Sequence, residues 1–349
     1  MKHIAFGLFD HLEQRPGEPA RDTYAGRIKL VQAAERAGFH AYHVAEHHFT
    51  PLGLAPSPGL FLAALSQVTT TIRLGSLVHL LPLYEPVRLV EEICMLDHLS
   101  GGRLDLGVGR GVSPFELGHY GVDFLDSKEL FDNAMDALTA GLTQPQLHHR
   151  SHRARYRGAP MVLQPLQRPL PPLWYGITSE ANVAFAAERG MHVVGLAPTQ
   201  HLSGLMRRYA ELREAGRGGV HDLSAPGSVS RRGALRQIYV GASDADAERT
   251  AARAYPVFYN NLMQLWRTFN VVNTLIPPTY TLARDLGILV TGGPGRVHEQ
   301  LAEFFADGAC NYLALEFSFG DLSDAEALAS LQCFAGEVMP ALARLASGE

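Results

Sequence analysis

The chain has 349 residues, of which 46% are hydrophobic and 19% are charged, and its formal net charge is −5. This composition predicts a large buried core and excludes a disordered chain. The sequence pI of 6.3 excludes the basic field that binding to nucleic acid or anionic lipid requires. No stretch approaches the run of about eighteen apolar residues that spans a membrane. Three widely spaced cysteines and an N-terminus without signal-peptide form favour a cytoplasmic protein with reduced thiols.

Strand-like and helix-like segments alternate along the chain. Short runs rich in apolar and β-branched residues predict strands at 4–9, 39–45, 72–81, 103–108, 172–175, 191–196, 237–240 and 310–317. Helical spacing predicts helices at 24–37, 59–69, 86–99, 127–142, 179–188, 200–214, 245–268 and 325–345, with Pro86 in a first turn and Ser179 as a cap. Eight strand–helix pairs predict a (β/α)₈ TIM barrel, an α/β fold, as a single domain over residues 1–349.

Two stretches are too long for ordinary barrel connections and predict insertions after strands 4 and 7. Residues 144–164, with alternating polar and apolar side chains, favour a hairpin. Residues 269–295, rich in proline and glycine, predict an excursion over the active face. A third stretch, 216–233, is rich in glycine, serine and arginine and predicts a mobile loop.

Two adjacent imidazoles, His47 and His48, follow the second predicted strand. The segment from His43 to His47 also fits the zinc pattern H-x-x-E-H, which requires a helix. The residues around His43 are strand-like and several prolines follow Thr50, so we predict no metal site. Alternation along a strand directs the two imidazoles to different places, one of them into the barrel mouth, where it can serve as a base near neutral pH. The alternative is that both satisfy local polar groups.

An arginine stands among glycines after the fourth predicted strand, in the segment 107–111. Arg110 has the planar fork that suits a phosphate, although glycines at a strand end also serve simply to turn the chain. A second anion-binding candidate is the start of the helix after the fifth strand, with Thr178, Ser179 and Asn182. The alternative there is an ordinary helix cap. His79, in the third strand, can face the barrel interior near a cofactor, and the alternative is that it is a buried core histidine.

Taken in order, these motifs resemble the bacterial luciferase-like, flavin-dependent monooxygenase family. The similarity covers nearly the whole chain, with specific marks at 46–50, 75–88, 96–103 and 107–111 and softer ones at 321–322 and 337–342. It implies a TIM barrel that takes reduced FMN from a separate NAD(P)H-dependent flavin reductase. In this family oxygen adds at flavin C4a, and the resulting C4a-peroxyflavin oxidises a small organic substrate.

The resemblance also implies roles for single residues. His47 matches the family's catalytic histidine, His48 its neighbour, and Arg110 the arginine on the FMN phosphate. The Leu77–Val78 bond falls where the family carries a non-prolyl cis peptide against the flavin ring. Gly109 replaces a reactive cysteine of the luciferase α subunit, so neither light emission nor a fatty-aldehyde substrate is implied. The cofactor-binding set implied is Leu77, Val78, His79, Gly109, Arg110, Thr178, Ser179 and Asn182, and Thr178 departs from the glutamate of luciferase.

Two other functions remain open at this point. Within the same superfamily the cofactor can be the deazaflavin F420, which would make the chain a hydride-transfer oxidoreductase. The chain can also be a non-catalytic flavin-binding relative or a silent subunit, although the presence of both His47 and Arg110 argues against this. A homodimer is implied by the resemblance, with the residues around Glu46 and the third predicted helix at its interface. The loops 112–126 and 269–295 carry no motif that names the substrate.

Overall fold

The computed structural model describes residues 4–151, 155–271 and 276–347. Parallel strands close into a barrel, because the last strand pairs with the first and the two middle strands β8 and β9 also pair. The barrel strands are β1 (Ala5–Asp10), β2 (Ala41–Val44), β3 (Arg73–Leu80), β4 (Leu104–Gly109), β7 (Leu173–Gly176), β8 (His192–Gly195), β9 (Arg232–Val240) and β11 (Tyr312–Glu316). Each overlaps a predicted strand, so the predicted (β/α)₈ barrel is confirmed.

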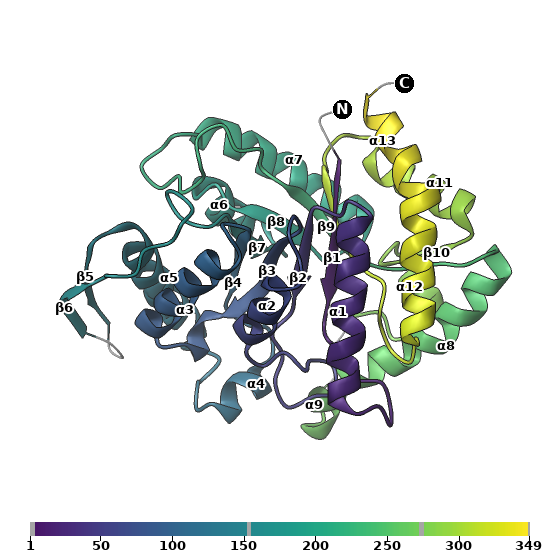
Figure 1. Ribbon diagram of the computed structural model, residues 1–349, viewed down its shortest axis with the longest axis horizontal. Helices are drawn as coiled ribbons and strands as arrows, with labels where there is room; N and C mark the ends of the chain where they lie inside the picture. The colour runs from purple at the N-terminus through teal and green to yellow at the C-terminus, as the bar shows by residue number, and fades with distance from the viewer. Residues whose placement is uncertain (1–3, 152–154, 272–275, 348–349) are drawn as a thin grey trace.

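Helices surround the barrel (Figure 1). They are α1 (Ala20–Arg36), α2 (Pro58–Ser66), α3 (Pro86–Leu99), α4 (Pro114–His119), α5 (Ser127–Thr143), α6 (Glu180–Glu188), α7 (Thr199–Gly216), α8 (Asp244–Leu262), α9 (Gln264–Thr268), α10 (Tyr280–Asp285), α11 (Pro294–Phe305), α12 (Asp324–Cys333) and α13 (Met339–Ser347). A 3₁₀ turn, η1 (Leu81–Leu83), follows β3, and a π-helical turn, η2 (Phe334–Val338), joins the last two helices.

The two predicted insertions differ in how well the sequence described them. The first contains the expected hairpin, in which β5 (Gln146–Arg150) pairs antiparallel with β6 (Arg155–Pro160). The second is more regular than expected, since it holds α10 and a further strand, β10 (Leu289–Gly292), that pairs with the end of β9. Its residues 272–275 lie outside the described part. The predicted loop 216–233 is also too long, because β9 already begins at Arg232.

Inward-facing side chains fill the barrel in layers, so the interior is a packed core and its mouth lies at the C-terminal strand ends. The deeper layer is aromatic and polar, with His43 Nε2 2.7 Å from the Tyr312 hydroxyl and the Trp174 ring between His43 and His192. Burial lowers the pKa of His43 to about 4 and that of His192 to about 3. Above it lies an apolar layer that includes Phe9, Ala45, Leu77, Val194 and Ala314.

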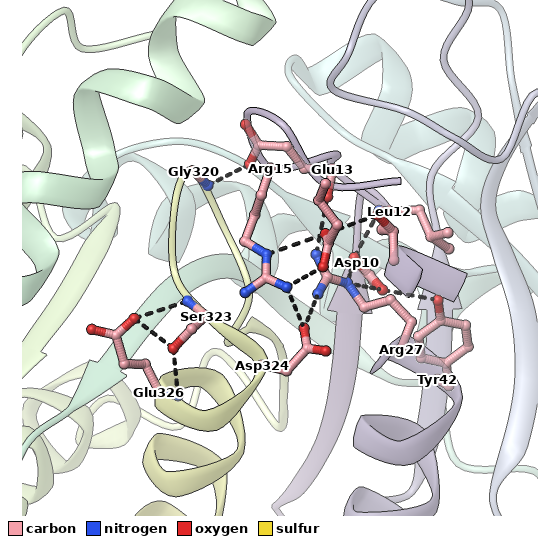
Figure 2. A network of polar contacts seen from close by, with 12 residues as sticks. Asp10, Leu12, Glu13, Arg15, Arg27, Tyr42, Gly320, Ser323, Asp324 and Glu326 are labelled. Atoms are coloured by element: carbon pink, nitrogen blue, oxygen red, sulfur yellow. Dashed lines mark hydrogen bonds and ion pairs between the residues drawn. The ribbon is translucent and has the colours of Figure 1, made fainter. Parts of the chain in front are cut away.

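A buried polar network ties β1 to the helices on either side of it (Figure 2). Arg27 of α1 lies 3.1 Å from an Asp10 carboxylate oxygen, and the Tyr42 hydroxyl donates to the same carboxylate over 3.2 Å. Arg27 also donates to the Glu13 carbonyl and lies 3.8 Å from Asp324 at the start of α12. Because both charges of the central pair are almost fully buried, loss of either partner would leave an uncompensated charge. The network therefore fixes the loop that follows β1.

The cysteines are free thiols, as predicted, with Cys94 and Cys310 buried and Cys333 partly exposed. Across the described ranges, none of the helices has the length and apolar character needed to cross a membrane.

Candidate active site

The first predicted site residue, His47, lies at the C-terminal mouth of the barrel just beyond β2. Its Nδ1 is 3.1 Å from Glu116 Oε1 of α4, and its side chain keeps 19% of its surface exposed. Burial disfavours the charged imidazole, but the neighbouring Glu116 carboxylate outweighs burial and holds the pKa of His47 above its usual value. Since Nδ1 faces the carboxylate, Nε2 remains for proton exchange with a ligand.

The sequence analysis missed Glu116, which lies in the loop region 112–126. Ser113 caps α4 by accepting a hydrogen bond from the Glu116 amide over 3.2 Å, and Pro114 occupies the first turn. The second oxygen of Glu116 accepts from the His48 amide over 3.3 Å. The spacing Ser113-x-x-Glu116 is a helix-start signal that could have placed this carboxylate beside a strand end.

His48 points away from the mouth, so the expectation that the two imidazoles diverge is confirmed. Its Nε2 lies 2.9 Å from Glu46, its Nδ1 lies 3.1 Å from the Tyr120 hydroxyl, and it is 5% exposed. The other Glu46 oxygen accepts from the Leu80 amide and the Tyr84 hydroxyl. With both nitrogens engaged, His48 holds the strand end in place, and its predicted part in catalysis stays a prediction.

The zinc pattern is not helical, because His43 lies on β2 inside the barrel while His47 lies at the mouth. The two histidines therefore do not lie on one helical face, which was the premise of the zinc interpretation.

The seam between β3 and β4 explains two of the glycines. The Leu77–Val78 peptide bond is cis, at the place that the resemblance implies, and the pairing register with β4 shifts between Ser76 and His79. A Cβ on Gly107 would lie 2.1 Å from the Ser76 carbonyl oxygen, and one on Gly109 would lie 2.4 Å from a Val78 methyl. Both glycines thus stand within β4 and let the two strands approach, whereas the predicted turning role belongs to Gly111, with φ +87°.

His79 is buried at 2% exposure. Its Nδ1 contacts the Ser76 hydroxyl, and its ring packs edge-on against Tyr84 with centroids 5.6 Å apart. Burial lowers the pKa of His79. These contacts match the alternative of a core histidine, and contact of His79 with a cofactor stays a prediction.

Arg110 follows β4 directly and is half-buried, with its guanidinium carbon 4.9 Å from the centre of the Phe124 ring. Among the described residues, none forms a hydrogen bond or ion pair with this guanidinium. Burial raises the pKa of Tyr175, at the end of β7, while the charge of Arg110 and a hydrogen bond with Asn182 act to lower it. Both predicted anion-binding elements therefore act on the same tyrosine.

The start of α6 carries the predicted cap. Ser179 Oγ accepts from the Asn182 amide over 3.4 Å, and the hydroxyls of Thr178 and Ser179 donate to Asn182 Oδ1 over 3.0 and 3.1 Å. Thr178 and Ser179 are exposed, so the first turn of α6 opens to solvent next to Arg110. Such a turn has amide groups without helical partners and favours an anion.

Two further residues at the mouth escaped the sequence analysis. His11, after β1, lies with its Nδ1 2.6 Å from Glu316 Oε1 at the end of β11, and its ring centre is 5.5 Å from that of His47. In the same loop after β1, burial raises the pKa of Glu13 to about 8, with hydrogen bonds from Gly320 and Asn261 opposing the rise. The available signal for His11 was its position two residues beyond a predicted strand, like that of His47.

A closed (β/α)₈ barrel with a carboxylate-bound imidazole and a half-buried arginine at its C-terminal mouth has the features of a TIM-barrel enzyme. Over residues 4–309 the chain matches the family described as luciferase-like monooxygenase, and it belongs to that family.

Curated relatives match over most of this chain. It is 38% identical over 320 residues to the uncharacterized protein y4wF of Sinorhizobium fredii, covering 91% of this chain and 92% of the relative. It is 30% identical over 266 residues to the oxygenase component of a flavin-dependent trigonelline monooxygenase of Acinetobacter baylyi, covering 74% and 70% respectively.

Solved structures share the fold at lower identity. The monooxygenase RslO1 of Streptomyces bottropensis superposes with a TM-score of 0.86 at 21% identity, covering 97% of this chain and all of the other. The oxygenating constituent of 3,6-diketocamphane monooxygenase of Pseudomonas putida, in complex with FMN, gives 0.79 at 22% identity and covers 97% and 98%. A coenzyme F420-dependent tetrahydromethanopterin reductase of Methanopyrus kandleri gives 0.70 at 14% identity and covers 97% and 99%.

Proposed function

We propose that this protein is the oxygenase component of a two-component flavin-dependent monooxygenase. It uses reduced FMN, supplied by a separate NAD(P)H-dependent flavin reductase, and dioxygen to transfer one oxygen atom to a small organic substrate through a C4a-peroxyflavin. The observation that carries the proposal is the occurrence, at one barrel mouth, of the His47–Glu116 pair and of Arg110, which forms no hydrogen bond or ion pair with the described residues. The trigonelline relative is likewise named as an oxygenase component.

The residues beside β4 fit the phosphate of FMN. Arg110 offers a half-buried guanidinium that forms no hydrogen bond or ion pair with the described residues, and the first turn of α6 offers hydroxyls and amides without helical partners. Glycines at 107 and 109 let β3 approach β4 closely beside residues 77–78. In the proposal Arg110, Ser179 and Asn182 hold the phosphate, and residues 77–78 support the ring.

When bound, the reduced flavin supplies the electrons and activates oxygen. The protein's own part begins with His47, whose Nε2 is held toward the mouth by the bond from Nδ1 to Glu116. At neutral pH this imidazole can accept a proton from the substrate, or donate one to an oxygen that gains charge. His48, Glu46 and Tyr84 fix the strand end that carries it. The apolar layer below closes the site to water from the core side.

An anaerobic titration with reduced FMN, followed by mixing with oxygen in a stopped-flow spectrometer, tests the proposal. We expect tight binding of reduced FMN and then a long-lived absorbance band of the oxygen adduct, whose decay changes when the right substrate is added. Binding without such a band would point to a different flavin function. If F420 binds and reduced FMN does not, the chain is an F420-dependent oxidoreductase and the proposal is wrong.

The phosphate part of the proposal has its own variant. Arg110→Ala removes one charged hydrogen bond to the phosphate and should weaken reduced FMN by about 1.5–3 kcal/mol, while riboflavin, which lacks the phosphate, should lose almost nothing. Equal losses for the two flavins would remove Arg110 from the phosphate site.

We further propose a homodimer formed through α2 and α3. These helices pack on each other and expose Leu60, Met95 and Leu99 at 78%, 55% and 50%. Apolar side chains exposed together are typical of a subunit interface. Light scattering should give twice the mass of 38.1 kDa, and the mass of a single chain would contradict the dimer.

A further inference from the structure

The barrel mouth holds a second imidazole–carboxylate pair that the proposed function does not use. His11 leaves the end of β1, and its Nδ1 lies 2.6 Å from Glu316 Oε1 at the end of the neighbouring strand β11. The His11 side chain keeps 12% of its surface exposed, whereas Glu316 is fully buried. The carboxylate therefore stands behind the imidazole, and only the imidazole faces the mouth.

This pair repeats the arrangement of His47. Both imidazoles bind a buried carboxylate through Nδ1, and in the part of the chain that the structure describes no protein group bonds either Nε2 atom. Their ring centres are 5.5 Å apart with planes inclined by 34°, so the two rings are in contact. Phe9 and Phe258 flank the other sides of the His11 ring at 4.8 and 5.7 Å. Apolar walls of this kind keep water from screening the charges.

The chemistry of two such rings differs from that of one. A carboxylate at Nδ1 orients each ring and leaves its Nε2 to accept a proton. Two imidazolium ions in contact repel each other, so protonation of one ring disfavours protonation of the other. One ring then serves as acid while the other serves as base. The carboxylates that act on His47 are Glu116, Glu46 and Glu316, and Glu316 also bonds His11.

We propose that His11, backed by Glu316, is a further catalytic residue that shares one exchangeable proton with His47 across the mouth. The inference rests on the proposed function for its reaction. In that reaction a substrate O–H or N–H bond breaks with its electron pair left on the substrate, and the proton passes to the free Nε2. The proton held by the partner ring goes to the oxygen that is reduced to water. The electrons come from the reduced flavin and the oxygen atom from dioxygen, so the histidines move protons only.

Proton sharing can be measured without cofactor or substrate. The full-length protein, labelled with ¹³C at the histidine Cε1 positions, is titrated by NMR, and His11→Asn and His47→Asn assign the two signals. In His11→Asn the ionisation of His47 should move to higher pH by about half a unit or more, because a neighbouring cation is lost and Glu316 is left unpaired. In Glu316→Gln it should move to lower pH, because a carboxylate that favours imidazolium is removed.

Opposite shifts from the two variants are a result that general loosening of the mouth would not produce. His221→Asn, an exposed loop histidine with 59% side-chain exposure, is the matched control and should leave His47 unchanged. Circular dichroism verifies that each variant is folded, and His11→Gln replaces His11→Asn if the latter is not. An unmoved His47 ionisation in a folded His11 variant overturns the proposal.

A second readout separates this inference from the proposed function. The decay of the oxygen adduct is followed against pH for the wild type and for His11→Asn, and the variant should lose one of two ionisations. Coupled NMR titrations without any oxygen adduct would contradict the monooxygenase function and leave the shared proton standing. An adduct whose pH profile is unchanged in His11→Asn would overturn the role of His11 while the monooxygenase function stands.

Discussion

The barrel holds two groups of histidines that meet different surroundings. His43 and His192 lie deep in the barrel against Trp174, where His43 is fully buried and His192 is partly buried, and burial lowers the pKa of both. His11 and His47 lie at the mouth, where each binds a carboxylate and keeps part of its ring exposed. One apolar layer of side chains separates the two groups along the barrel axis.

The surroundings of the two groups show what makes a histidine reactive in this fold. Without a nearby carboxylate partner, burial removes the charge, and the imidazole becomes a packing element with a polar edge. With a carboxylate at Nδ1 and an open Nε2, the imidazole is oriented for proton exchange with a ligand at the mouth. Position along one strand decides which of these applies: His43 and His47 are four residues apart in the sequence.

The largest loss of activity is expected when His47 is replaced. His47→Asn deletes the proposed base, so substrate-dependent oxygen consumption should fall about 10²–10⁴-fold while reduced FMN still binds. Turnover is measured with an added flavin reductase, and binding by anaerobic titration. If the variant turns over at the wild-type rate, His47 is a packing residue like His43 and has no part in catalysis.

Glu116→Gln keeps the shape of the side chain and removes the charge that raises the pKa of His47. Because that pKa then falls, the acid limb of the pH–rate profile should move to lower pH. The imidazole is also a weaker base and is oriented less firmly, so turnover at neutral pH should drop about 10–100-fold. The profile itself is the measurement. A uniform loss at every pH, without movement of the limb, would give Glu116 a purely structural role.

His192→Asn probes the deep layer, with an amide oxygen that can still accept from the Arg231 amide. In the wild type the folded-state pKa of about 3 lies below the unfolded value of 6.5, so stability is lost as pH falls through 6.5 toward 3. The variant lacks this group. Between pH 7 and pH 5 its free energy of unfolding should therefore fall by about 2 kcal/mol less than that of the wild type. Urea unfolding at the two pH values checks it, and equal losses would contradict the buried neutral state.

The smallest effect concerns Glu13, whose pKa of about 8 lies above its unfolded value of 4.5. Its contribution to stability is complete below pH 4.5 and is lost as pH rises through 8. Between pH 7 and pH 8, Glu13→Gln should therefore lose about 1 kcal/mol less stability than the wild type. Thermal unfolding in the two buffers measures this. A wild type that is equally stable at both values would show that Glu13 is already ionised.

The sequence supports the fold better than the site, for a physical reason. Short apolar runs between glycines and prolines mark each barrel strand locally, so all eight were predicted, and His47 and Arg110 were found because they directly follow such runs. β10 was missed because its four residues lie within a stretch dominated by proline and glycine. Glu116 and Glu316 were missed because their partners lie 69 and 305 positions away in the chain. Only the closed barrel brings such pairs together.

The glycine seam between β3 and β4 has a consequence for directed evolution of this enzyme. Even alanine at 107 would place a methyl group against the Ser76 carbonyl, which cannot retreat without parting the two strands, and alanine at 109 would press on a Val78 methyl. A library that randomises position 107 would be filled with variants that fail to fold. Diversity aimed at a new substrate range belongs instead in the exposed residues of 112–126 other than Ser113 and Glu116, where no strand pairing limits the side chain.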